Sequence, residues 1–175
     1  MRKLSHQEIV SRQRSKNQFP KLPFCAVLNN IRSLYNVGSI FRTADGAGVQ
    51  KIYTCGITGH PPNPQIAKTA LGAEVTVPWE YEQDAVSVIK QLKRKNYQII
   101  LLEQIEGAIA HDEFKPNPPV CLVLGNEIGG VSPEIIDLCD QAVEIEMLGL
   151  KNSLNVSVAF GVIAYHMRGH LKSPV

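Results

Sequence analysis

The sequence predicts an α/β domain built on a mostly parallel sheet that helices cover on both faces. Predicted strands and helices alternate along the chain. The strands are also nearly continuous apolar runs, as in residues 24–28 and 120–124. Strands that are buried on both faces have this pattern, whereas half-exposed strands alternate apolar and polar residues. With 175 residues, 44% of them hydrophobic, the chain has the size of one domain with a proper core.

The first half of the chain is predicted to begin with a short helix. Ser5 and Glu8 have the spacing of a capping box, which predicts a helix to about Ser15 that Pro20 and Pro23 end. A strand is expected next over 24–28, followed by a helix that runs from the polar loop 29–38 through Ala44 and is stopped by Gly46 and Gly48. The remaining elements of this half are a strand over 49–55, a loop over 56–64, a short helix from Gln65 and a strand near 75–79.

The second half continues the alternation. The spacing of Val86, Ile89 and Leu92 predicts an amphipathic surface helix over 82–96. We interpret its basic side chains as solvated rather than RNA-binding; they are Lys90, Lys93, Arg94 and Lys95. The elements expected next are strands over 97–102 and 120–124, a helix with Ser132 as N-cap and Pro133 at its first position, a strand over 142–145, and a helix after Ser153 and Asn155. That last helix is apolar on nearly all sides, which predicts burial against the sheet and a second subunit.

Basic charge is concentrated at the N-terminus. Residues 1–21 hold six Lys or Arg and one Glu, and residues 22–175 hold twelve basic and fifteen acidic side chains. We therefore divide the chain into a basic arm with a short helix (1–21) and a main domain (22–175). A basic arm on a mildly acidic body suits contact with the phosphate backbone of a nucleic acid, although short charge runs are also common on solvated surfaces.

Several classes of protein do not fit this composition. No apolar run approaches the roughly 20 residues of a membrane span, and the first residues lack the apolar segment of a signal peptide, so we expect a cytoplasmic protein without a membrane partner. The cysteines are widely spaced without a C-x-x-C pair, which favours reduced core thiols; they are Cys25, Cys55, Cys121 and Cys139. His166 and His170 lack an H-E-x-x-H pattern, so no metal is expected.

Polar or glycine-rich segments follow three of the predicted strands, at 29–42, 125–130 and 147–155. Loops after parallel strands cluster at one edge of a sheet, so these segments are expected to form one site. No P-loop occurs and no G-x-G-x-x-G follows a strand, which disfavours the two common nucleotide-binding motifs. The residues alone therefore indicate a polar pocket and leave its ligand open.

Segments 36–46, 124–130 and 145–157 resemble the three motifs of the SpoU (TrmH-type) RNA methyltransferases of the SPOUT superfamily. The resemblance spans about residues 24–168. It implies a C-terminal trefoil knot and a homodimer. It also implies methylation of a ribose 2′-hydroxyl in tRNA or rRNA, with S-adenosyl-L-methionine (S-adenosylmethionine) as the methyl donor. Glu146 stands where the family usually has proline, which bears on the rigidity of that loop.

The resemblance also implies the residues of the site. Those expected around the adenosyl group are Leu124, Gly125, Ile145, Met147 and Leu154. Apolar walls suit an adenine, and glycine lets the backbone come close. The polar residues expected to be catalytic are Asn36, Arg42, Glu127, Ser153 and Asn155. Purely structural roles remain the alternative, with Ser153 and Asn155 as helix caps and Asn36 and Glu127 as loop-bracing side chains.

The family's arginine at the position of Arg42 has been assigned the role of a base. A guanidinium is effectively always protonated, so we interpret Arg42 as the positive charge that stabilises the developing alkoxide and clamps an adjacent phosphate. The proton then leaves through Glu127, a phosphate or water. Two other classes stay open: a catalytically silent knotted RNA-binding module, and an unrelated nucleotide-binding α/β enzyme.

Overall fold

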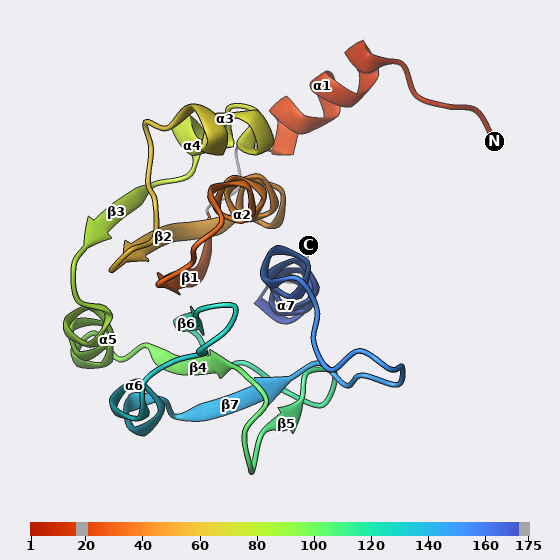
Figure 1. Cartoon of the computed structure of the whole chain (residues 1–175). Helices are drawn as coiled ribbons and strands as arrows, with labels where there is room; N and C mark the ends of the chain where they lie inside the picture. Colours follow the sequence, from red (N-terminus) through yellow and green to blue (C-terminus); the bar gives the residue numbers. More distant parts are fainter. Residues whose placement is uncertain (17–20, 172–175) are drawn as a thin grey trace.

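The strands of the computed structural model, which describes residues 1–16 and 21–171, form one parallel sheet (Figure 1). They are β1 (Leu22–Asn29), β2 (Val49–Cys55), β3 (Trp79–Glu82), β4 (Gln98–Leu102), β5 (Ile109–Ala110), β6 (Val120–Leu124) and β7 (Gln141–Glu144). Their order in the sheet is β3-β2-β1-β6-β4-β7-β5, and every neighbouring pair is parallel. The predicted parallel α/β sheet is therefore confirmed.

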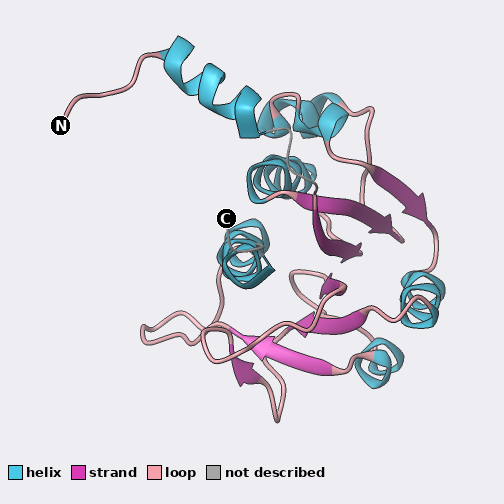
Figure 2. Ribbon diagram, turned by 180° about the vertical axis from the view of Figure 1, so that it is seen from behind, coloured by secondary structure: helices cyan, strands magenta, loops and turns pink. Residues whose placement is uncertain are grey.

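Helices cover both faces of this sheet, as Figure 2 shows from the opposite side to Figure 1. They are α1 (His6–Lys16), α2 (Leu34–Ala47), α3 (Pro64–Ala70), α4 (Ala73–Thr76), α5 (Ala85–Arg94), α6 (Pro133–Leu138) and α7 (Val156–Leu171). Ala26 and Leu28 of β1 belong to the core shared with α2, α3 and α7, whereas Cys25 and Val27 belong to the core shared with α5 and α6. None of the described helices is both long and apolar enough to cross a membrane.

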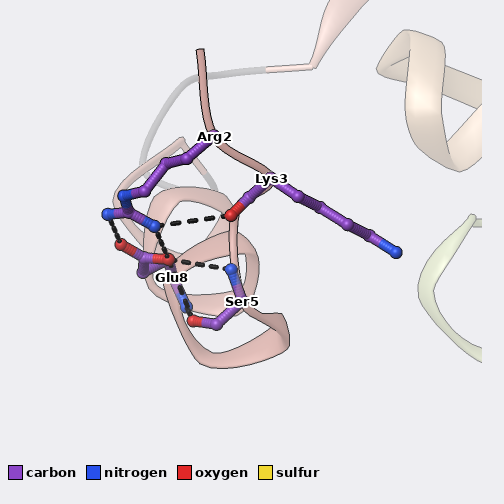
Figure 3. A network of polar contacts seen from close by, with 4 residues as sticks. All are labelled: Arg2, Lys3, Ser5 and Glu8. Atoms are coloured by element: carbon purple, nitrogen blue, oxygen red, sulfur yellow. Dashed lines mark hydrogen bonds and ion pairs between the residues drawn. The ribbon is translucent and has the colours of Figure 1, made fainter.

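The capping box predicted for the N-terminal helix is confirmed. The Ser5 Oγ accepts a hydrogen bond from the Glu8 N–H at 3.3 Å, and the Glu8 carboxylate accepts one from the Ser5 N–H at 2.8 Å. Figure 3 shows the Arg2 guanidinium bridging the same carboxylate while the Lys3 side chain points away. Arg2 and Ser5 hold the pKa of Glu8 at about 2. The predicted helix stop at Pro20 lies outside the described residues.

Two predicted boundaries in the first half are wrong. The expected strand near 75–79 is helix α4 followed by β3, because Leu71 and Gly72 both have positive φ and turn the chain before α4 begins. The second helix runs past Ala44 to Ala47 and accommodates Gly46. It ends at Gly48, whose φ of 81° forms a left-handed C-cap that donates to Ala44 and Asp45.

The predicted N-cap positions of the last two helices are confirmed for Ser132 and Asn155 but not for Ser153. Ser132 occupies the N-cap position of α6 but makes no side-chain capping bond. Ser153 lies two residues before the cap of α7 and does not cap it. Asn155 does, because its Oδ1 accepts the Ser157 N–H at 2.9 Å.

One face of α7 is buried and the other is exposed in the single chain. Phe160, Ile163 and Met167 are almost fully buried against α2 and β1, whereas Val158 is 52% and Tyr165 is 53% exposed. Burial of α7 against the body of its own chain is therefore confirmed, and its contact with a second subunit stays a prediction. The exposed apolar side chains could be covered only by another molecule or another segment.

Ion pairs join α5 to α6 at the surface, and the core holds free thiols as predicted. Lys90 pairs with Glu134 at 3.2 Å and Lys93 with Asp140 at 2.7 Å, so these charges lie on the solvated surface that joins α5 to α6. Cys25, Cys55 and Cys121 are free and buried. Burial raises the pKa of the Cys55 thiol to about 12, which keeps it protonated and unreactive.

Close packing of α2 on α3 requires a glycine. A Cβ at Gly38 would lie 2.1 Å from the Thr69 Oγ1 and 2.3 Å from the Ile66 carbonyl oxygen. We expect Gly38→Ala to lower the free energy of unfolding by about 2 kcal/mol, because the overlap outweighs the gain in helix propensity. Urea denaturation measures the loss. The control is Gly169→Ala in α7, where no atom of residues 1–16 or 21–171 lies within 4 Å of an added Cβ, and equal stability of both variants would contradict this packing.

Candidate active site

A cavity of about 200 Å³ lies where β4, β6 and β7 end. It is lined by all five residues expected around the adenosyl group, namely Leu124, Gly125, Ile145, Met147 and Leu154. Glu127 and Ser153 also line it. The loops after parallel strands thus converge on one pocket, as the topology requires.

A chain of hydrogen bonds joins the three motif segments beside this pocket. The Glu127 carboxylate accepts from the backbone N–H groups of Arg32 at 3.1 Å and Ser33 at 3.4 Å, and from the Asn36 side-chain amide at 3.2 Å. The Asn36 Oδ1 in turn accepts from the Asn155 amide at 3.1 Å. Three of the five predicted catalytic residues are therefore in direct contact, although their sequence positions span 36 to 155.

Local structure explains why these side chains meet. The Ser33 side chain caps α2 by accepting the Asn36 N–H at 3.3 Å, which places Asn36 in the first turn. The loop after β6 is braced by Asn126, whose Oδ1 accepts the N–H groups of Ile128 and Gly129. The Asn126 amide also donates to the Asn30 carbonyl at 2.8 Å. Asn126 was absent from the predicted site, although asparagine in a glycine-rich turn after a strand is a recognisable signal.

The backbone around Gly125 is too close for any side chain. A Cβ there would lie 2.6 Å from the carbonyl carbon of Gly130, which itself has φ of 60°. The Glu103 carboxylate lies against Gly130, and Glu103 and Gln104 line the cavity. These two residues were also missed, although polar residues directly after a buried strand were the signal used for the other loops.

Glu127 is ionised at neutral pH. Burial raises the pKa of its carboxyl group, but the Arg32 N–H, its own N–H, the Asn36 amide and the Ser33 N–H lower it, and the net pKa lies below the usual value of 4.5. The carboxylate is therefore held as a hydrogen-bond acceptor between the loops after β1 and β6.

The lowered pKa of Glu127 predicts a pH-dependent contribution to stability. Because the folded pKa is below the unfolded one, the contribution is complete above about pH 4.5 and is lost as pH falls through the folded pKa. We expect the stability advantage of wild type over Glu127→Gln to be constant from pH 7 to 5 and to shrink below pH 4.5. Denaturant midpoints of both proteins across this range measure it. An advantage independent of pH would show that the carboxylate is not held by these donors.

Two predicted catalytic residues lie apart from the hydrogen-bonded chain. Ser153 lines the cavity, and its Oγ makes only a long 3.5 Å contact with the Asn152 side chain. Arg42 is exposed on α2 and does not line the cavity. It follows Asn36 by six residues, which turns it by about 240° around the helix axis. Arg42 and Glu127 are thus not joined within one chain.

His166 and His170 make contacts within the fold. The His166 Nε2 lies 2.7 Å from the Phe114 carbonyl oxygen, and the two imidazole rings are 4.6 Å apart. In the residues that the structure describes, no group of three or more His, Cys, Asp or Glu side chains is arranged to hold a metal ion.

The fold and the site define an α/β protein whose strand-end loops enclose an apolar and carboxylate-lined pocket beside the hydrogen-bonded chain Glu127–Asn36–Asn155. Comparison with known families agrees, because the SpoU rRNA Methylase family matches residues 23–165. The chain belongs to this family.

Individual relatives and solved structures support the assignment. The chain is 33% identical to the tRNA (guanosine(18)-2'-O)-methyltransferase of Aquifex aeolicus over 78% of its length, and 30% identical to that of Escherichia coli over 83%. It spans 64% and 62% of these two relatives. Its fold matches the crystal structure of the A. aeolicus TrmH/SpoU tRNA modifying enzyme with a TM-score of 0.81 at 27% identity, covering 94% of this chain and 83% of that one.

A further structural match carries a bound ligand. The AdoMet-bound rRNA methyltransferase from Sinorhizobium meliloti has a TM-score of 0.79 at 25% identity, with 90% of this chain and 60% of that chain covered.

Proposed function

We propose that this protein transfers a methyl group from S-adenosylmethionine to a ribose 2′-hydroxyl of tRNA or rRNA. The observation that carries the proposal is the hydrogen-bonded chain of Glu127, Asn36 and Asn155 beside a pocket lined by Leu124 and Ile145. Membership of the SpoU family supports it, as do the names of the relatives, which describe 2′-O-methyltransferases of tRNA and of 23S rRNA.

The pocket residues fit an adenosyl group. Leu124, Ile145 and Leu154 offer apolar surface to a flat base, and Gly125 leaves the backbone accessible where a Cβ would fill the space. When bound, the cofactor supplies an electrophilic methyl group on a positively charged sulfonium. Glu103 and Glu127 give the cavity wall a negative charge that suits a cation.

The chain's own residues then position the reacting groups and stabilise the transition state. The network of Glu127, Asn36 and Asn155 fixes the loops that hold the nucleophile in line with the methyl group, which is where much of the acceleration of such a displacement arises. Arg42 stabilises the developing alkoxide and clamps an adjacent phosphate. The proton leaves to Glu127, to a phosphate or to water, and Ser153 contributes a further polar group at the pocket wall.

The quaternary arrangement that we propose is a homodimer in which Arg42 serves the pocket of the partner subunit. Two observations support it: Arg42 is exposed and remote from its own pocket, and α7 exposes Val158 and Tyr165. We further propose that the segment after β7 forms a trefoil knot, since the Gln104 side chain donates to the Asn152 carbonyl at 2.9 Å before α7 returns to α2 and β1. A cytoplasmic location follows from the RNA substrate.

The basic arm is proposed to bind RNA phosphates next to the catalytic domain (22–175). In Figures 1 and 2, α1 projects from the body beside α3 and α4. Deletion of residues 1–16 is expected to weaken RNA binding and to make its salt dependence shallower, by about 0.9 in the log–log slope for each phosphate that the arm neutralises in the intact protein. Filter binding at several salt concentrations measures this, with calorimetry of the cofactor as an internal check.

Lys90→Gln is the matched control for the arm, because Lys90 is paired with Glu134 on the α5–α6 surface. It should leave both affinity and salt slope unchanged. RNA affinity that survives deletion of the arm would refute the arm's role.

A catalytically silent RNA-binding module is less well supported, because the polar network is intact. The experiment that separates the two is transfer of labelled methyl from S-adenosylmethionine to unmodified tRNA and rRNA, offered separately, together with calorimetry of cofactor binding. Cofactor binding with transfer to one RNA supports the enzyme. RNA binding without cofactor binding or transfer would support the silent module.

A further inference from the structure

Three aromatic rings gather at the β3 edge of the sheet. The His60 ring stacks on Trp79 with centroids 5.5 Å apart and an interplanar angle of 21°, and it lies 4.9 Å from the Tyr81 ring. His60 is exposed, Tyr81 is 41% exposed and Trp79 is half-buried against the core. We call His60, Trp79 and Tyr81 the aromatic platform.

The pleat of β3 separates this platform from acidic charge. Trp79 and Tyr81 point to one face of the sheet, while Glu80 and Glu82 alternate to the other. Glu80 is paired there with Lys51 of β2. Carboxylates repel a phosphate backbone, and those of β3 therefore lie on the face opposite to the platform.

The platform is tied to the catalytic network by hydrogen bonds. The Tyr81 hydroxyl donates to the Gly56 carbonyl at 3.1 Å, and the next residue, Ile57, donates its N–H to the Asn30 side chain at 3.0 Å. The buried Thr58 hydroxyl donates to the Leu28 carbonyl at 2.8 Å and accepts the Ile31 N–H at 3.0 Å. The loop that carries His60 is thus bonded to the loop after β1.

That same β1 loop continues directly into the site. Arg32 follows Ile31, and its N–H holds Glu127 while its side chain is exposed. Gly59 packs so tightly that a Cβ would lie 2.1 Å from the Leu34 side chain at the start of α2. The platform, an exposed guanidinium and the Glu127 network therefore lie along one connected rim of the strand ends.

We propose that the aromatic platform stacks an unpaired base of the RNA substrate next to the nucleotide that is methylated. The inference rests on the proposed function and deepens it by naming how the RNA is held. Proteins recognise unpaired RNA by stacking splayed bases on aromatic rings, and every base has a π-face, so the contact tolerates sequence changes. Arg32 is placed to contact the phosphate of the stacked nucleotide.

The single tryptophan of the chain makes the test direct. Trp79 fluorescence is followed during titration with unmodified tRNA transcripts and, separately, with unmodified rRNA fragments at saturating cofactor. We expect quenching that tracks binding. Tyr81→Leu keeps Trp79 as the reporter and the apolar bulk, and it is expected to weaken RNA binding about tenfold without changing cofactor affinity.

The matched control is Tyr97→Leu. Tyr97 is half-buried just before β4, and its hydroxyl donates to Gln50 at the start of β2, so it lies at the amino ends of the strands and not at the carboxyl ends where the loop of His60 lies. This variant should bind RNA as wild type does. His60→Ala provides a second, fully surface change that should weaken binding in the same direction as Tyr81→Leu.

The outcomes distinguish the platform from the proposed function. RNA binding and methyl transfer by wild type, with unquenched Trp79 and unchanged RNA affinity in both platform variants, would overturn the platform alone. No RNA binding by wild type would overturn both proposals. Equally weakened RNA binding in Tyr81→Leu and Tyr97→Leu would show a general effect on the sheet and would also overturn the platform.

Discussion

Arg42→Ala is expected to lower the rate of methyl transfer about 10²- to 10³-fold while leaving cofactor affinity unchanged. The effect is large because a positive charge aimed at a developing alkoxide acts mainly in the transition state. Cofactor affinity should survive because the proposed contacts of Arg42 are with the reacting hydroxyl and an adjacent phosphate of the RNA, and it does not line the cavity of its own chain. Single-turnover transfer of labelled methyl and calorimetry of S-adenosylmethionine measure the two quantities.

Two further variants sharpen the Arg42 prediction. Arg42→Lys keeps the charge but not the planar pair of donors, so it should retain only part of the activity. Arg94→Ala removes an exposed arginine at the end of α5 and is expected to have no effect. Nearly full activity of Arg42→Lys with an unchanged pH profile would rule out a planar bidentate role.

Gly125→Ala is expected to weaken cofactor binding strongly. The added Cβ would meet the backbone of Gly130 at 2.6 Å, so the loop after β6 must move, and with it the wall of the pocket. Overpacking of this kind costs about 1–3 kcal/mol, which corresponds to roughly a 5- to 150-fold decrease in affinity if it acts on binding alone. Calorimetric titration with S-adenosylmethionine measures the affinity, and circular dichroism checks that the variant is folded.

Gly149→Ala is the control for Gly125→Ala. Gly149 lies in the neighbouring loop after β7, where nothing lies within 4 Å of an added Cβ. Its affinity for the cofactor should match that of wild type. Tight binding by Gly125→Ala would contradict the close approach of the two glycine backbones.

The sheet could be predicted because the amino-acid composition of each strand reflects whether its two faces are buried. Runs such as Val120–Leu124 are buried on both faces and read as continuous apolar segments. The strand predicted near 75–79 was wrong because backbone conformation, and not apolar character, determines the structure of this segment. Positive φ at Leu71 and Gly72 starts a short helix in a segment whose Val75 is 84% exposed, so apolar character there did not indicate a strand.

The site was predictable only where polar residues followed recognisable strands in a known motif pattern. The residues expected around the adenosyl group line one cavity, because parallel strands bring their following loops together. Asn126 and Glu103 also follow buried strands, so the same signal could have found them, but their backbone partners become visible only in the structure. The aromatic platform was also invisible, because only the pairing of β2 with β3 brings Trp79 and Tyr81 beside His60.

The central claim is methylation at the ribose 2′-hydroxyl, and the position of the transferred group tests it most directly. Labelled RNA from the transfer reaction is hydrolysed with alkali, which cleaves every phosphodiester except one next to a 2′-O-methyl group. We predict that the label appears in an alkali-resistant dinucleotide and disappears with Arg42→Ala. Label in mononucleotides would place the methyl group on a base and contradict the proposed reaction.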